Sequence, residues 1–353
     1  MSFTSRYRNI NALLILLLPT VVAMSQQAPV QPVIAQSQAA SRMFLDVVVS
    51  SKPGAPVSGL PAQDFTLFDN KTQRPVTSFQ EVKLHEVPTE AILVIDAVNA
   101  SPMVIANERI AVEKFLRANN GALELPTSLV LFTNAQTEVK ALSKDGNMLS
   151  ETLKNSVIAR RTIAPTTGNF GAVERLGLSI KTLHQLLARE SSLPGRKIIL
   201  WVSPGWPMLW GPGTVDLTPS QQSEMFSNVV NLSRELRDGR FTVYFVNPLG
   251  AGEDRGNAFY YKDFLKGISK PSQVYAGALA LQVLAIQSGG LVFNASNDIT
   301  GELQMCMADN ANYYGLSFDS PPAEHPDEYH QIEIQIAKPG LVARTREGYY
   351  NQP

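Results

Sequence analysis

Continuous apolar runs recur through the middle of the chain, at 91–95, 129–132, 198–202, 241–246 and 291–293. Runs of this kind are typical of strands that are buried on both faces. Between them, apolar residues recur at spacings of three and four, which predicts helices. These residues are Val173, Leu176, Ile180, Leu183 and Leu187, then Met225, Val229, Leu232 and Leu236, then Leu279, Val283 and Ile286. The alternation predicts an α/β fold with a doubly wound, mostly parallel, Rossmann-like sheet.

Both ends of this region lack the helical pattern and are expected to form strands, the first from its β-branched residues. Strands are expected at 44–49, 65–68 and 75–81 before it, and at 313–318 and 341–349 after it. Between those last two, Ile332, Ile334 and Ile336 alternate with polar residues, as in a strand with one wet face. We therefore predict an N-terminal β segment (42–86), an α/β domain (87–310) and a C-terminal β segment (311–353). The two β segments are expected to pack together as one small all-β module.

The first 25 residues have the composition of a secretory signal peptide. Arg6 and Arg8 precede an apolar run at 12–22, and Ala23-Met24-Ser25 offers a small-residue cleavage site before Gln26. The run is about half the ~20 residues that a membrane-spanning helix needs, although a retained anchor is the alternative. Residues 26–41 are rich in Gln, Ala, Pro and Ser, which predicts a disordered linker. We expect an exported protein, periplasmic or extracellular, without a membrane span after cleavage.

Composition excludes several functional classes. Thirty Lys and Arg residues against 31 Asp and Glu residues give a net charge of -1, so no nucleic-acid partner is expected. A single cysteine, Cys306, excludes an intrachain disulfide and a cysteine-based metal cluster. The four histidines lack metal-ligand spacing, and no hydrolase or phosphate-binding motif occurs. We therefore expect a protein that is not an enzyme.

Three features lie in the order found in von Willebrand factor type A-like domains. They are the apolar strand that ends at Asp96, the segment 165–170 before a helix, and 287–290 before the last short strand. The chain from about 44 to 350 also resembles the acidobacterial subfamily of von Willebrand factor A-related proteins. The residues that carry this resemblance are Val47-Val48-Val49, 56–60, Asp64-Phe65, 340–342 and 346–350. The resemblance implies a type A α/β fold and a class of interaction proteins.

The resemblance also implies a cation site at the carboxyl ends of the strands, built from Asp-x-Ser-x-Ser, a Thr and a second Asp. This chain has Asp96, but the two serine positions hold Val98 and Ala100. A degenerate site for weakly bound Mg²⁺ or Ca²⁺ would use Asp96, Asn99, Ser101, Thr166, Thr167 and Ser203. The alternative is that Asp96 hydrogen-bonds its own loop, while Ser101 and Pro102 begin a helix. No other cofactor is expected.

Loops at the same edge of the sheet form a candidate rim for a protein partner. Its residues are Trp206, Met208, Trp210, Asn247 and Asp254. Alternatively, the two tryptophans fold back and cover the end of the sheet. We predict an exported protein-protein interaction or adhesion module that binds at this rim. The other candidates are an envelope structural or assembly protein that uses its β module, and a secreted hydrolase.

Overall fold

A computed structural model describes residues 42–51, 56–133, 137–140, 142–156, 168–207, 217–250 and 259–353, with the side chains of 168–170 excepted. All of these residues belong to one compact unit. The expected signal peptide (1–25) and linker (26–41) lie outside the described residues and stay predictions. Among the described helices, none combines the length and hydrophobicity needed to cross a bilayer.

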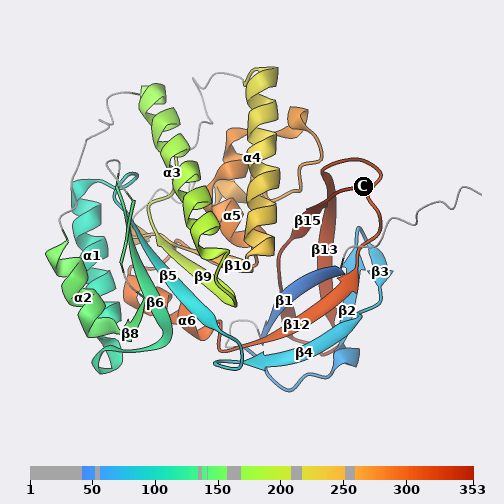
Figure 1. The fold of residues 1–353 in the computed structure, drawn as a ribbon, viewed down its shortest axis with the longest axis horizontal. Coiled ribbons are helices and arrows are strands. Elements are labelled where there is room, and N and C mark those ends of the chain that lie inside the picture. The colour runs from blue at the N-terminus through green and yellow to red at the C-terminus, as the bar shows by residue number, and fades with distance from the viewer. Residues whose placement is uncertain are drawn as a thin grey trace, which may run out of the picture. The chain divides into compact units, whose positions relative to one another are not determined.

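A mostly parallel sheet forms the centre of the α/β part (Figure 1). Its parallel strands are β5 (Thr89–Asp96), β6 (Ala122–Phe132), β9 (Arg196–Val202), β10 (Phe241–Val246) and β11 (Val292–Phe293). Two short strands, β7 (Thr137–Val139) and β8 (Ser143–Asp145), pair antiparallel with β6. The order β11-β10-β9-β5-β6-β7 places β5 and β9 in the interior of the sheet. Every side chain of β9 and β10 is buried, which explains their continuous apolar sequences.

Helices cover both faces of this sheet. They are α1 (Pro102–Arg117), α2 (Gly146–Asn155), α3 (Gly168–Glu190), α4 (Pro219–Asp238), α5 (Leu281–Gln287) and α6 (Ile299–Ala308). One core joins α3, α4 and α5 to residues such as Ile92 and Val94, and another joins α1, α2 and α6 to Leu93 and Ile95. Alternate residues of β5 thus enter opposite cores, as the pleat requires. The fold is therefore mixed α/β with a mostly parallel central sheet.

The predicted helical patterns correspond to α3, α4 and α5, with two local differences. Val173 is 54% exposed, because it lies in the first turns of α3 beyond the sheet-covering part. Leu279 belongs to the short 3-10 helix η7 (Ala276–Leu279), and α5 begins after it. The other 3-10 helices are η1 (Ala62–Asp64), η2 (Ala118–Gly121), η5 (Tyr260–Phe264) and η6 (Pro271–Gln273).

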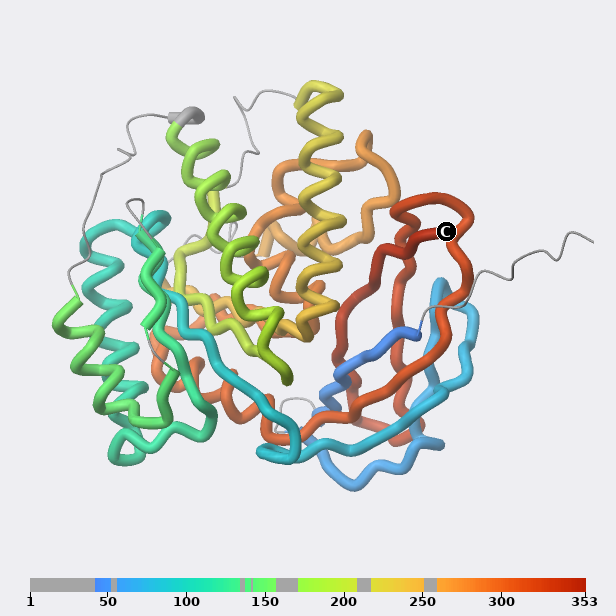
Figure 2. The backbone as a smooth tube through the Cα atoms, viewed as in Figure 1, coloured from blue at the N-terminus to red at the C-terminus, as the bar shows by residue number. Residues whose placement is uncertain are grey.

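Two antiparallel sheets combine strands from both ends of the described chain (Figure 2). The first has the order β14-β1-β12-β4, with β14 (Leu341–Arg344), β1 (Arg42–Ser51), β12 (Asn312–Asp319) and β4 (Ser78–Lys83). The second has the order β15-β13-β2-β3, with β15 (Gly348–Asn351), β13 (Glu328–Ile336), β2 (Phe65–Asp69) and β3 (Thr72–Arg74). Leu45, Leu67, Tyr314 and Tyr349 belong to one core shared by both sheets. The domain boundaries themselves stay a prediction.

Direct contacts join these antiparallel strands to the α/β part. Phe226 of α4 packs edge-on against Tyr350 of β15, with ring centroids 6.2 Å apart. Tyr350 also packs edge-on against Tyr329 of β13, with ring centroids 5.2 Å apart. Arg240, just after α4, donates from Nη2 to the Asp46 carboxylate of β1 over 2.7 Å. The C-terminal end of α4 therefore lies against the first antiparallel sheet.

Candidate functional site

Asp96 is the last residue of β5 and lies at the carboxyl edge of the central sheet, with no exposed surface. Ser203 follows β9 and Asn247 follows β10. Because parallel strands end at the same edge, the sequence order alone places these three residues there. This edge is the usual ligand-binding position in open α/β sheets, so its chemistry decides whether the expected cation site exists.

Five donors from the chain itself surround the Asp96 carboxylate. Oδ1 accepts from the backbone N–H groups of Val98 and Asn99, both at 3.0 Å. Oδ2 accepts from Asn99 Nδ2 at 2.8 Å, Ser203 Oγ at 2.9 Å and Trp201 Nε1 at 3.2 Å. A carboxylate has about four lone-pair sites, so these bonds use its accepting capacity. Burial raises the pKa of Asp96, and the hydrogen bonds from Asn99, Ser203 and Trp201 oppose that rise.

A second layer of hydrogen bonds ties the surrounding loops to α3. Asn99 Nδ2 also donates to Ser179 Oγ at 3.0 Å, and that hydroxyl donates to the carbonyl of Arg175 at 2.8 Å. On the other side, Ser203 Oγ accepts from the N–H of Gly205 at 3.1 Å. The Asp96 network therefore links β5, β9 and α3.

Of the remaining candidate ligands, Ser101 has a structural role. Its hydroxyl accepts from the N–H of Val104 at 3.4 Å, and Pro102 follows as the first residue of α1. This arrangement matches the alternative expected for the helix start. Thr166 and Thr167 lie outside the described residues.

The hydrogen bonds at Asp96 do not favour a divalent cation, because N–H and O–H donors already use the lone pairs of both carboxylate oxygens. One candidate ligand oxygen is left, Asn99 Oδ1, which is buried and has no hydrogen-bond partner among the described residues. In the described part of the chain, no group of three or more His, Cys, Asp or Glu side chains could hold a metal ion. The bonds at Asp96 instead favour the alternative in which the carboxylate organises its own loop.

Glu108 was not among the candidate residues, although it shares this interior. It is completely buried on α1, and neither carboxylate oxygen has a hydrogen-bond partner among the described residues. Burial raises the pKa of Glu108 well above its usual range, and the neighbouring charge of Asp96 raises it further. The sequence pattern could have indicated that Glu108 is buried, because it lies on the same helix face as Ile105, Val112 and Phe115.

The described rim residues are buried. Trp206 is 3% exposed and packs edge-on against Trp201, with ring centroids 5.3 Å apart. Asn247 is 2% exposed, and its Oδ1 accepts from the N–H of Leu249 at 2.9 Å. Trp206 and Asn247 therefore do not present side chains to a partner in this structure. The indole ring of Trp206 covers Trp201, and its Nε1 has no hydrogen-bond partner among the described residues. Met208, Trp210 and Asp254 lie outside the described residues.

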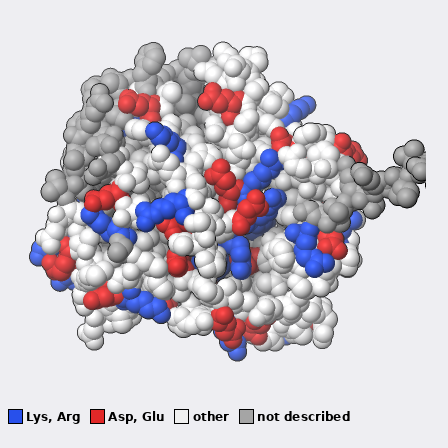
Figure 3. Space-filling view, viewed as in Figure 1, with Lys and Arg blue, Asp and Glu red and all other residues white. Residues whose placement is uncertain are grey.

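Apolar side chains are exposed on α1 beside this edge. Met103 is 74% exposed and Ile110 is 68% exposed, and their spacing of seven residues places them on one helix face. Ile110 also lines a groove of about 420 Å³ together with Pro248 and Leu249, from the segment that follows β10. Figure 3 shows Lys and Arg residues interspersed with Asp and Glu residues on the face in view. The α1 surface thus offers apolar contacts on a protein of mixed charge.

Comparison with known proteins gives distant structural similarities only. No protein-family model matches the chain, and no curated protein matches it. An aerotolerance-related membrane protein from Bacteroides fragilis has 14% identity and a TM-score of 0.32, with 62% of this chain and 97% of that one covered. The SpRpn10 VWA domain has 9% identity and a TM-score of 0.29, with 61% and 92% covered.

The pilus adhesin SpaC from Lactobacillus rhamnosus GG has 9% identity and a TM-score of 0.37. The alignment covers 85% of this chain and 48% of SpaC, so the chain spans about half of the adhesin's length. At such TM-scores, none of these similarities assigns a function. The strand order and helix placement are compatible with a von Willebrand factor type A-like fold, and membership of the acidobacterial subfamily stays a prediction.

Proposed function

We propose that this chain is an exported, non-enzymatic protein-interaction module that binds its partner at the carboxyl edge of the central sheet, without a metal ion. The observation that carries this proposal is the exposed apolar face of α1, which carries Met103 and Ile110 and borders the groove at Leu249 through Ile110. Large apolar side chains that share one exposed face are typical of interaction sites on soluble proteins.

Removal of this face from water would supply the binding energy. Burial of an apolar side chain such as Ile or Met contributes about 1.5–3 kcal/mol. Two such residues and the groove could therefore anchor a partner, since a few buried side chains dominate most interfaces. Ile110 is the better anchor, because it also lines the groove.

The absence of a metal requirement is supported by the hydrogen bonds of Asp96. In many ligand-binding sites at this position a cation would bridge protein and partner, but here N–H and O–H donors occupy both carboxylate oxygens. A partner would consequently contact apolar and hydrogen-bonding groups directly.

A hydrolase is less well supported. Such an enzyme would need a carboxylate of raised pKa in an accessible pocket. Asp96, Glu108 and Glu302 have raised pKa values, but none of them lines the groove at Leu249. A structural protein that pairs through its β strands stays the alternative, because each half of β1 has one partner strand, β12 over 42–47 and β14 over 48–51.

The proposal is tested by capture of partners from an envelope extract with the intact chain and two variants. Ile110→Glu places a charge on the α1 face and is expected to reduce capture at least tenfold, a loss of about 1.4 kcal/mol. Leu193→Glu is the matched control, because Leu193 is 45% exposed in the connection that precedes β9, at the opposite edge of the sheet. Capture should survive EDTA.

Equal capture by Ile110→Glu and by the intact chain would reject the α1 face as the binding site. Loss of capture in EDTA would reject the metal-free mode. Export is checked separately by N-terminal sequencing of protein from outside the cytoplasm, which should begin near Gln26. A sequence that starts within the first 20 residues would indicate a retained anchor.

A further inference from the structure

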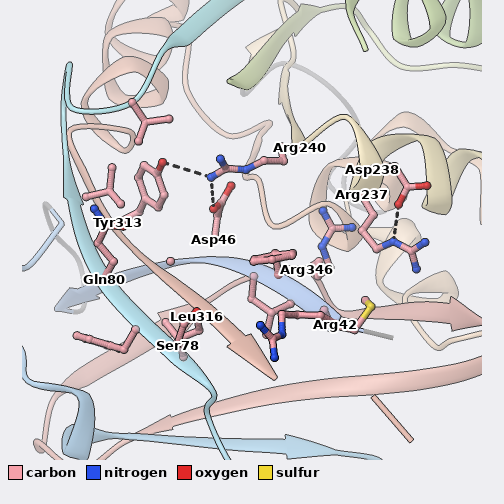
Figure 4. Close-up of a pocket in the computed structure, with 17 residues that line it drawn as sticks. Arg42, Asp46, Ser78, Gln80, Arg237, Asp238, Arg240, Tyr313, Leu316 and Arg346 are labelled. Atoms are coloured by element: carbon pink, nitrogen blue, oxygen red, sulfur yellow. Dashed lines mark hydrogen bonds and ion pairs between the residues drawn. The ribbon is translucent and has the colours of Figure 1, made fainter. Parts of the chain in front are cut away.

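A pocket of about 680 Å³ lies where the first antiparallel sheet meets the C-terminal end of α4 (Figure 4). None of the residues that line it belongs to the Asp96 network. Strands β1, β12 and β4 provide one side of it, including Asp46, Gly315 and Gln80. Arg237 and Asp238 of α4, together with Arg240, provide the second side. Arg346, from the connection between β14 and β15, provides the third. Volumes of this size suit small-molecule ligands.

Positive charge exceeds negative charge among the described residues that line the pocket. Four are arginines and two are aspartates, namely Arg42, Arg237, Arg240, Arg346, Asp46 and Asp238. The chain as a whole has a net charge of -1, so the excess is local.

Three of these arginines have partners within the protein. Arg240 Nη2 donates to Asp46 Oδ1 at 2.7 Å. Arg237 donates from Nε to Asp238 at 2.8 Å and from Nη1 to the carbonyl of Tyr350 at 3.3 Å. Arg42 forms an exposed ion pair with Asp319 at 3.3 Å.

Arg346 differs, because it has no hydrogen bond or ion pair among the described residues. Asp46 exerts the largest attraction on it, but the two oxygens of that carboxylate contact Arg240 at 2.7 Å and Arg196 at 3.4 Å. Burial lowers the pKa of Arg346 to about 10, an effect that Asp46 opposes and Arg237 reinforces. In Figure 4, dashed contacts reach Arg240 and Arg237 and none reaches Arg346.

The floor of the pocket is open at Gly315. A Cβ atom added there would meet only the carbonyl oxygen of Gln80, at an ordinary contact distance of 3.8 Å. Phe44, also in the lining, is 63% exposed and offers an apolar surface beside this opening. The pocket thus combines unpaired positive charge with apolar surface and free space.

We propose that this pocket binds a small molecule that carries a carboxylate or phosphate group, with the oxyanion held by Arg346 and the rest of the molecule over Gly315 and Phe44. A guanidinium presents five N–H donors in a planar fork that matches the oxygens of either group. Bound anion would supply the partner that Arg346 lacks in the protein. This site is separate from the α1 face and does not depend on the proposed interaction function.

The test uses the full chain and two probes, inorganic phosphate and citrate, with binding measured by calorimetry at constant ionic strength. Saturable binding is expected, and Arg346→Gln should weaken it about tenfold or more, because a bidentate charged hydrogen bond is lost. Arg189→Gln is the matched control, since Arg189 is an exposed arginine of α3 outside the pocket. This control should bind within about twofold of the intact chain.

A second variant, Gly315→Val, fills the floor and leaves every charge in place. Valine suits a strand, and the added Cβ meets no close contact, so the fold should persist. Citrate should then bind at least tenfold more weakly, while phosphate, which is smaller, should bind nearly as before. That difference separates a site for organic acids from a site for the free anion.

Two results would overturn the proposal. One is no saturable binding of either probe to the intact chain, which would leave Arg346 as a solvated arginine. The other is equal binding by the intact chain and Arg346→Gln, which would place any anion elsewhere. Circular dichroism melts of each variant, recorded without probe, distinguish lost binding from lost folding.

Discussion

Asp96 and Arg346 both place an ionisable group among protein atoms, yet their surroundings differ. Asp96 has five hydrogen bonds to its carboxylate, all from the chain itself. Arg346 has none among the described residues. The first group lies where open α/β sheets usually bind ligands, and the second lies where strands from both chain ends meet α4.

The difference indicates which site remains available to a ligand. A buried charge whose hydrogen bonds are complete contributes to a rigid structure, and a ligand must break those bonds before it can bind. Arg346 is half-buried and has no partner among the described residues, so a ligand can pair with it without breaking a bond within the protein. Position in the fold thus predicts where a site can form, whereas hydrogen bonding decides whether it is open.

The largest expected effect comes from Asp96→Ala, which removes the acceptor of the whole network. Donors on Asn99, Ser203 and Trp201 would lose their partner inside the protein, at about 1–3 kcal/mol for each unsatisfied group. Because such losses are not additive, we expect the free energy of unfolding to fall by about 4 kcal/mol. Urea denaturation at neutral pH measures this change.

Asp145→Ala is the control for that experiment. Asp145 also accepts a backbone hydrogen bond, from Met148 at 3.0 Å, but at the exposed start of α2. Its loss should cost about 1 kcal/mol. Similar losses for Asp96→Ala and Asp145→Ala would mean that the Asp96 network is no tighter than a surface helix cap.

Glu302 on α6 is only partly hydrogen-bonded, in contrast to Asp96, and we expect it to make the stability of the protein depend on pH. It is 2% exposed, Oε2 has no partner among the described residues, and burial, reinforced by Asp298, raises its pKa to about 7. Because the folded state binds the proton more tightly, its stabilising effect is complete below about pH 4.5 and is lost as pH rises through 7. Each pKa unit corresponds to about 1.4 kcal/mol, and with partial solvation we expect a loss of about 2 kcal/mol.

Urea denaturation of the intact chain and Glu302→Gln at pH 5 and pH 8 measures that dependence. Glutamine cannot ionise, so the variant should lose less stability between the two pH values than the intact chain. Glu108 and Asp96 shift in the same direction and remain in both proteins, so only the difference between the two slopes reports Glu302. Identical slopes would show that Glu302 does not titrate in this range.

Local sequence pattern was sufficient for the elements but not for the sites. The apolar run 91–95 falls within β5, and Ser101 and Pro102 begin α1, because each depends on neighbouring residues alone. The pocket at Arg346 was not predicted, since its residues come from segments around 42–46, 237–240 and 313–316 that meet only in the fold. The sequence left two positions open for Trp206, in a partner-binding rim or folded back over the end of the sheet. Its contact with Trp201 favours the second position.

The smallest expected effect is that of Mg²⁺ on thermal stability, and it sharpens the contrast at Asp96. A ligand that binds only the folded state stabilises it by RT ln(1 + [L]/Kd). If the saturated carboxylate gives a Kd about ten times the working concentration, the gain is roughly 0.06 kcal/mol, which a melting curve does not resolve. Melts in millimolar MgCl₂, with NaCl at equal ionic strength as control, should therefore coincide. A clear rise in melting temperature that disappears in Asp96→Asn would show that Mg²⁺ displaces the Asn99 and Ser203 donors. The carboxyl edge would then be an open site like the Arg346 pocket, and hydrogen bonding would no longer separate the two regions.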